Sequence, residues 1–143
     1  MDVTTNAGDA MGALGKMQPD LDNAIRQATT YVGGIAATEM ANLIKGRHPR
    51  GTKTPSPVGS PPTNITGNLR RSIHSRVTGF NGKYTATVGA NMVYARTLEF
   101  GGENWAEGVR YPFVAPTATL MTKNNQARNI FINYVRTVLF KNR

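Results

Sequence analysis

The side chains that could do chemistry are few and widely separated in this chain of 143 residues. There is no cysteine, so a disulfide, a thiolate metal site and a thiol nucleophile are excluded. The two histidines, His48 and His74, have no second histidine or carboxylate at ligand spacing, and we therefore expect no metal site. Carboxylates are too scarce for paired acid–base chemistry, and no phosphate-binding glycine loop or nucleophile elbow is present. The sequence predicts a protein that is not an enzyme and uses no cofactor.

The charge of the chain is concentrated in one interval. No acidic residue lies between Glu39 and Glu99, and this interval holds nine Lys and Arg residues, which equals the formal net charge of +9. Such a block attracts anions through its summed field and through counterion release, whether the anion is DNA or an acidic protein face. A solvated basic loop without a partner is the alternative. The candidate surface for a partner or for DNA in a channel consists of Lys45, Arg47, Arg50, Lys53, Arg70 and Arg71.

Two further residues are candidates for an interface. Glu99 ends the acid-free interval, and its carboxylate either pairs with an arginine of its own subunit or forms a salt bridge between subunits. Trp105 lies in a polar loop near glycines, where an aromatic side chain either anchors an interface or packs on its own domain. The arginines expected near Glu99 are Arg70, Arg71 and Arg96, and the aromatic residues expected in the core are Tyr94, Phe100, Tyr111 and Phe113.

The chain is expected to form a flexible N-terminal arm over residues 1–19 and a single domain over residues 20–143. Apolar residues recur at spacings of three and four from about residue 20 to about residue 45, which predicts a long helix. Gly33 and Gly34 lie inside it and mark either a bend or a close helix contact. Residues 46–66 hold five prolines and too little apolar surface to fold alone, which predicts a long basic loop that becomes ordered against a neighbouring subunit.

The clearest local signal is a β-hairpin over about residues 74–90. Asn81 and Gly82 both tolerate positive φ and favour a two-residue type I′ turn. This turn pairs residues whose numbers sum to 163, so Val77 faces Ala86 and one side of the ribbon is mostly apolar. A third strand is expected at about residues 109–113 and a final helix at about residues 116–140. The predicted class is α+β, with a small antiparallel sheet packed against two long helices.

Three segments carry a more specific signal when they are read in order. They are "PP…TG-x-L-R-x-S-I" at residues 60–73, "Y-A-x-x-x-E-F-G" at residues 93–102 and "x-P-F-x-x-P-x-A" at residues 110–118. In this order and spacing they resemble the HK97 gene-product-10-like family of tailed-phage proteins. The resemblance extends over about residues 20–140.

The resemblance implies a structural virion protein that forms a ring at the head–tail junction, where it completes or terminates the tail and joins it to the head. It implies a homo-oligomer, expected to be hexameric, in contact with neck or connector proteins and tail-tube proteins. It also implies non-specific contact with genomic DNA and a place in the virion after assembly in the host cytoplasm. No apolar run approaches about 20 residues, so we expect no membrane-spanning segment. The alternative is a free basic nucleic-acid-binding protein, although no helix-turn-helix, zinc knuckle or aromatic stacking ladder is visible.

Overall fold

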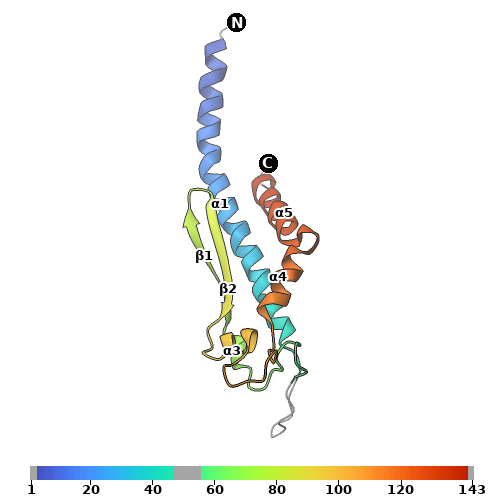
Figure 1. The fold of residues 1–143 in the computed structure, drawn as a ribbon. Coiled ribbons are helices and arrows are strands. Elements are labelled where there is room, and N and C mark those ends of the chain that lie inside the picture. Colours follow the sequence, from blue (N-terminus) through green and yellow to red (C-terminus); the bar gives the residue numbers. More distant parts are fainter. Residues whose placement is uncertain (1–2, 47–55, 142–143) are drawn as a thin grey trace.

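The computed structural model describes residues 3–46 and 56–141 and confirms the α+β class. The long helix α1 (Val3–Leu43) is the spine of an elongated molecule, with the hairpin on one side and the C-terminal helices on the other (Figure 1). The remaining elements are α2 (Asn68–Arg71), β1 (Ile73–Phe80), β2 (Lys83–Ala90), α3 (Ala95–Phe100), α4 (Val114–Thr122), the 3-10 helix η1 (Lys123–Asn125) and α5 (Gln126–Phe140).

Helix α1 begins much earlier than the sequence predicts. It starts at Val3 instead of near Asp20, and Pro19 lies inside it. Alanine, leucine, methionine and glutamine in residues 7–18 favour the helix and offset three glycines in the same stretch. The boundary expected between residues 19 and 20 therefore falls within one continuous helix, and the mobility of the arm stays a prediction.

The glycine pair in α1 marks a close contact with the hairpin. A Cβ atom built on Gly33 would clash with Ser75 Oγ and lie 3.0 Å from Ala86 Cβ. The same atom on Gly34 would meet nothing within 4 Å. Since only Gly33 faces the sheet, the sequence alternative of a close helix contact is the correct one at this residue.

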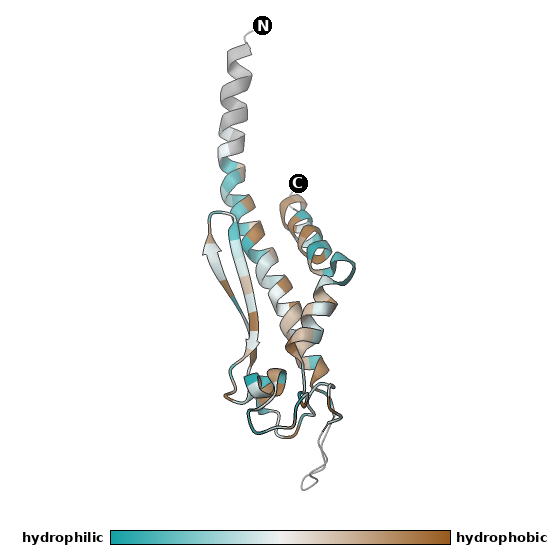
Figure 2. Ribbon diagram, viewed as in Figure 1, coloured by the Kyte–Doolittle hydropathy of each residue, from teal (hydrophilic) through white to brown (hydrophobic). Residues whose placement is uncertain are grey.

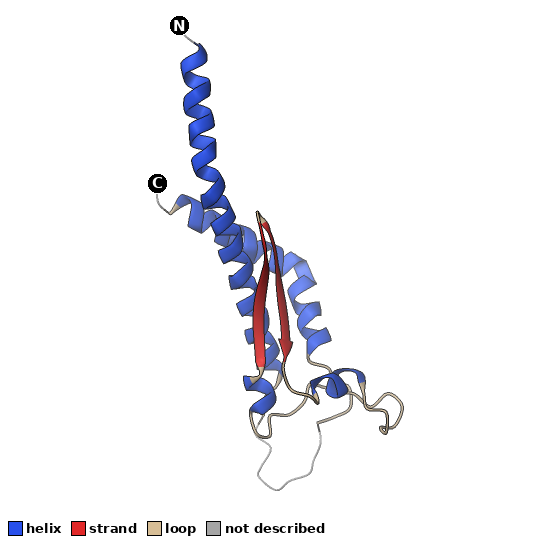
Figure 3. Cartoon of the chain, turned by 90° about the vertical axis from the view of Figure 1, so that its left-hand side faces the viewer, coloured by secondary structure: helices blue, strands red, loops and turns tan. Residues whose placement is uncertain are grey.

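The predicted hairpin is confirmed in both turn and register. Asn81 and Gly82 have φ angles of 50° and 74°, and Val77 pairs with Ala86 as the residue-number sum of 163 requires. The half-buried side chains alternate with exposed ones along both strands. Figure 3 shows the two strands lying along α1, which covers one face of the ribbon.

A carboxylate on α1 fastens the tip of the hairpin. Asp22 Oδ1 accepts the backbone N–H of Gly82, and Asp22 Oδ2 accepts the hydroxyl of Tyr84 at 2.7 Å. The hydrogen bond to Asp22 raises the pKa of Tyr84 above its ordinary value of 10.0, because it stabilises the protonated phenol. The part of α1 that is N-terminal to Asp22 extends past the hairpin turn (Figure 1).

The third strand expected at residues 109–113 is not formed, and the sheet within the described residues has two strands. The backbone of this segment bonds to loops and to α3 instead. The carbonyl of Arg110 accepts the N–H of Gly59 at 2.9 Å, and the N–H of Tyr111 donates to the carbonyl of Leu98 at 2.7 Å. Pro112 has no N–H to give, so a regular ladder is interrupted here.

The single final helix expected over residues 116–140 is broken in two. Asn124 and Asn125 adopt left-handed conformations with φ angles of 53° and 54°, which separate α4 from α5. Asparagine is one of the few residues with a side chain that visits this region readily. Pro116 lies in the first turn of α4, as expected.

The two long helices do not share one face of the sheet. α1 contacts the hairpin, whereas α5 packs against α1, where the rings of Tyr31 and Tyr134 stack with centroids 4.7 Å apart. α5 contains no fully buried residue. Most of the buried core is one cluster near α3, where apolar residues gather as α1 meets α4 (Figure 2), and its members are Met40, Ile44, Leu69, Ala95 and Phe113.

Candidate functional site

The three sequence segments come together at the α3 end of the molecule, and Glu99 joins two of them. Its side chain is only 7% exposed. The carboxylate accepts the backbone N–H groups of Phe113 at 2.8 Å, Val114 at 2.9 Å and Ala115 at 2.8 Å. These groups begin α4 and have no partner within that helix, so Glu99 caps α4 from α3.

The prediction that Glu99 pairs with Arg70, Arg71 or Arg96 of its own subunit is therefore wrong within the described part of the chain. A buried carboxylate needs compensating hydrogen bonds, and here three backbone N–H groups supply them in place of a guanidinium. Glu99 acts inside one subunit by fixing α3 against the start of α4. The alternative of a salt bridge between subunits stays a prediction.

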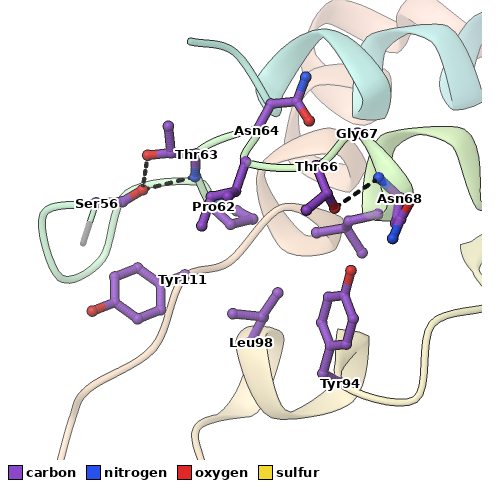
Figure 4. Close-up of a pocket in the computed structure, with 12 residues that line it drawn as sticks. Ser56, Pro62, Thr63, Asn64, Thr66, Gly67, Asn68, Tyr94, Leu98 and Tyr111 are labelled. Carbon is purple, nitrogen blue, oxygen red and sulfur yellow. Dashed lines mark hydrogen bonds between the residues drawn. The ribbon is translucent and has the colours of Figure 1, made fainter. Parts of the chain in front are cut away.

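A pocket of about 530 Å³ opens beside this junction. In Figure 4 Tyr94, Leu98 and Tyr111 lie on one side of it, facing the loop that contains Pro62 and Thr66. Apolar side chains dominate its wall, and the polar groups come from the loop. The remaining lining residues are Ser56, Thr63, Asn64, Ile65, Gly67, Asn68 and Leu69.

The loop wall of the pocket is tied to the rest of the subunit. Ser56 and Thr63 join through their hydroxyl groups, and Ser56 Oγ also accepts the backbone N–H of Thr63 at 2.8 Å. The N–H of Gly59 donates to the carbonyl of Arg110, which lies far from it in the chain. Residues 56–66 of the predicted loop are therefore positioned by hydrogen bonds within one subunit.

Comparison with known proteins gives one result. Residues 9–101 match the HK97-gp10-like family, whose description is "Bacteriophage HK97-gp10, putative tail-component". The chain belongs to this family. The matched part contains α2, the hairpin, α3 and the loop wall of the pocket, and it ends before the segment that begins α4. Neither the curated proteins nor the solved structures gave a match.

The family resemblance stated from the sequence is thus confirmed, and with it a bacteriophage tail component of structural character. Within residues 3–46 and 56–141 no group of three or more histidine or carboxylate residues is placed to hold a metal ion. The helices of the same two ranges include none that is long and apolar enough to cross a membrane.

The basic residues predicted as one surface differ in whether the structure describes them and in the contacts that they make. Arg47, Arg50 and Lys53 lie outside the described residues, and the ordering of their loop against a neighbour stays a prediction. Lys45 and Arg70 are exposed. Arg71 is also exposed but bonds locally: its guanidinium donates to the Thr66 carbonyl at 3.2 Å and to Asn68 Oδ1 at 2.8 Å.

Trp105 packs on its own subunit while a third of its surface stays accessible. Its ring meets the ring of Tyr111 edge to face, with centroids 5.8 Å apart, and it lies against Gly102. The sequence left open whether Trp105 anchors an interface or packs on its own domain, and the structure shows the packing on its own domain. A second role as an interface anchor stays a prediction.

Two aromatic residues expected in the core are exposed. Phe100 is 76% exposed and Tyr94 is 42% exposed, whereas Phe113 is buried as expected. Ala95 and Glu99, four residues apart, form the buried face of α3, so Phe100 next to Glu99 points elsewhere. The pocket itself was missed because its walls come from segments that are distant in the sequence, although the motif tyrosine Tyr94 was a signal for it.

Proposed function

We propose that this tail-component family member forms a ring at the head–tail junction, where it completes or terminates the tail and joins it to the head. The observation that supports it most is the set of large apolar side chains that stay exposed in two regions of the elongated subunit. Exposed apolar surface marks contacts with other proteins where it is contiguous. The exposed residues are Met17, Leu21 and Phe80 near the hairpin turn and Ile65, Val93 and Phe100 near α2 and α3.

A ring of identical subunits needs two different surfaces on each subunit. A head-to-tail contact that closes by rotation generates a cyclic oligomer, and a hexamer is the expected size. The small core and the half-exposed α5 are consistent with a subunit that gains stability from its neighbours. The partners of the ring would be a neck or connector protein on one side and the tail tube on the other.

Genomic DNA must pass such a junction. Lys45 and Arg70 are exposed, and basic side chains that line a channel would contact phosphates without reading bases. The DNA contact would be weak for each subunit and would be summed around the ring. Assembly would take place in the host cytoplasm and the product would be in the virion.

A nonsense mutation in the gene tests the role directly. We expect filled heads and free tails to accumulate unjoined in infected cells, and purified protein added to the lysate to restore joined, infectious particles. Electron microscopy and plaque counts are the measurements. Joined and infectious particles in the absence of the protein would reject the proposal.

Solution behaviour separates the ring from the alternative of a free nucleic-acid-binding protein. Size-exclusion chromatography with light scattering is expected to give a closed oligomer without DNA. A monomer or dimer that forms a discrete complex only when duplex DNA is added would favour the alternative. The two outcomes differ in mass, so one experiment decides between them.

A further inference from the structure

The two ends of the molecule differ in charge as well as in shape. The N-terminal segment, defined as residues 3–21 of α1, projects away from the body, and α3, which supplies Leu98 to the pocket, lies near the opposite end (Figure 1). Up to Asp22 the segment and its junction carry three aspartates and one lysine. The pocket face is defined as the pocket with the exposed charged residues that adjoin its lining residues in the chain or are hydrogen-bonded to them. These charged residues are all basic: Lys45, Arg70, Arg71 and Arg110.

Residues 15–21 of the N-terminal segment are exposed in the single subunit. The hairpin turn is hydrogen-bonded to Asp22 of α1. Leu21, next to Asp22, is 43% exposed, and Met17, five residues before Asp22, is 49% exposed. Gly12 and Gly15 have no atom within 4 Å of an added Cβ. Pro19 removes one helical hydrogen bond and most helical stability in proteins comes from packing, so a partner that covers this stretch would stabilise it.

The apolar stripe of the segment continues one that is buried in the body. Positions 3, 7, 10, 14, 17 and 21 follow one another at alternating spacings of four and three, and the series runs on to 24 and 28. Ala24 and Ala28 at these last positions are fully buried. The stripe that packs inside the subunit at Ala24 and Ala28 is exposed at Met17 and Leu21, as expected of a helix that is completed by another chain.

The pocket has the chemistry to receive such a stripe. Leu98, Tyr111 and Pro62 form apolar wall, while Ile65, 73% exposed, and Tyr94 stand at its accessible side. A volume of about 530 Å³ accommodates large apolar side chains of a helix, and the basic surroundings favour an acidic partner. Apolar and electrostatic complementarity together point to the N-terminal segment itself as the occupant.

We infer that the N-terminal segment of one copy docks on the pocket face of the next copy, with Met17 and Leu21 as its apolar anchors. This contact is the head-to-tail interface of the ring and rests on the proposed function. It uses two unlike surfaces of one chain, so each subunit offers one segment and one pocket.

Two full-length variants test the contact from its two sides. Met17→Ser/Leu21→Ser removes the anchors, and Ile65→Ser/Tyr94→Ser removes the accessible side of the pocket, in both cases without a change of charge. We expect each variant to be folded by circular dichroism and to self-associate more weakly by on the order of 100-fold in sedimentation velocity. The two variants mixed in equal amounts are expected to form a one-to-one dimer, because one intact segment then meets one intact pocket.

Matched serine variants at exposed positions outside the contact serve as controls. Gln18→Ser/Asn23→Ser changes residues off the apolar stripe, and Val58→Ser changes an exposed apolar residue that does not line the pocket. Both are expected to assemble like the wild type. Association of the wild type is also expected to weaken as salt is raised, since charge complementarity contributes to it.

The outcomes separate this contact from the ring as such. A wild type that forms a ring while both anchor and pocket variants assemble equally well would overturn the contact and leave the ring proposal standing. Variants that are monomeric alone and stay monomeric when mixed would also overturn it. A wild type that remains monomeric at high concentration and on purified tails would reject both the contact and the ring.

Discussion

At the scale of single residues, the fold depends on a few close contacts. In some an added methyl group would clash, and in others a lost hydrogen-bond acceptor would leave a backbone N–H without a partner. Gly33 is one of them. Gly33→Ala is expected to cost about 1–3 kcal/mol in free energy of unfolding, because the new methyl group overpacks the contact with Ser75. Urea unfolding measures the change.

The neighbouring glycine provides the control for this prediction. Gly34→Ala places its methyl group in open space and is expected to stabilise the helix by up to about 1 kcal/mol. Ser75 Oγ is buried and has no hydrogen-bond partner among residues 3–46 and 56–141, so Ser75→Gly combined with Gly33→Ala should restore part of the lost stability. Equal effects of alanine at the two glycines would contradict the close contact.

Glu99 is the second such residue. Glu99→Gln keeps the size of the side chain but replaces one acceptor oxygen by an amide donor, so an N–H of α4 loses its partner. We expect a loss of about 1–3 kcal/mol in unfolding free energy. The exposed Glu103→Gln should stay within about 0.5 kcal/mol of the wild type. If Glu103→Gln lowered the free energy of unfolding as much as Glu99→Gln, the effect would come from the loss of a negative charge and not from the loss of the helix cap.

Tyr84 links stability to alkaline pH. Its pKa is raised in the folded state by the hydrogen bond to Asp22, so its contribution is fully present below the unfolded pKa of about 10 and is lost as pH rises through the folded value. Thermal unfolding between pH 8 and 11 is expected to show a fall in stability that is smaller in Tyr84→Phe. The same fall in both proteins would assign it to other groups.

At the scale of elements, the hairpin was predictable and the helix ends were not. Turn residues such as Asn81 and Gly82 act locally, so they fix the register before any tertiary contact is considered. The strand expected near Tyr111 failed because its N–H group bonds to Leu98, a partner that no local pattern reveals. The break after α4 did have a local signal, the two consecutive asparagines, which the apolar periodicity on either side concealed.

That break yields a prediction for the C-terminal helices. A β-branched residue does not adopt the left-handed conformation of Asn125, so Asn125→Val is expected to destabilise the fold by about 1–2 kcal/mol. Asn125→Gly accepts the same conformation without strain and should be close to the wild type. Urea unfolding measures both variants. A neutral valine variant would mean that α4 and α5 can join as one straight helix.

At the scale of the whole molecule, the sequence identified the family and the basic interval but not the shape of the site. The pocket combines residues from the loop after α1, from α3 and from the segment before α4, and no spacing in the sequence reports that they meet. Glu99 was correctly singled out, yet its partners are backbone groups, which carry no signature in a sequence.

The basic interval is expected to act as a summed surface. Each exposed charge alone contributes little and is screened beyond about 8–10 Å at physiological salt. Reversing Arg47, Arg50 and Lys53 together to glutamate should impair head–tail joining or DNA retention while the subunit stays folded, whereas single alanine variants should behave normally. Plaque counts and circular dichroism are the measurements. Fully infectious particles that carry the triple reversal would show that the basic interval is a solvated surface without a partner.

The central position of α1 has a consequence for how the chain folds. The hairpin and α5 rest on opposite sides of α1, and both follow it in the chain, α5 by a long interval. Helix α1 is therefore synthesised before the elements that enclose it. Its two faces are covered only by contacts of high sequence separation, which form slowly because large loops must close first. We expect newly made α1 to be the part of this protein that chaperones hold longest.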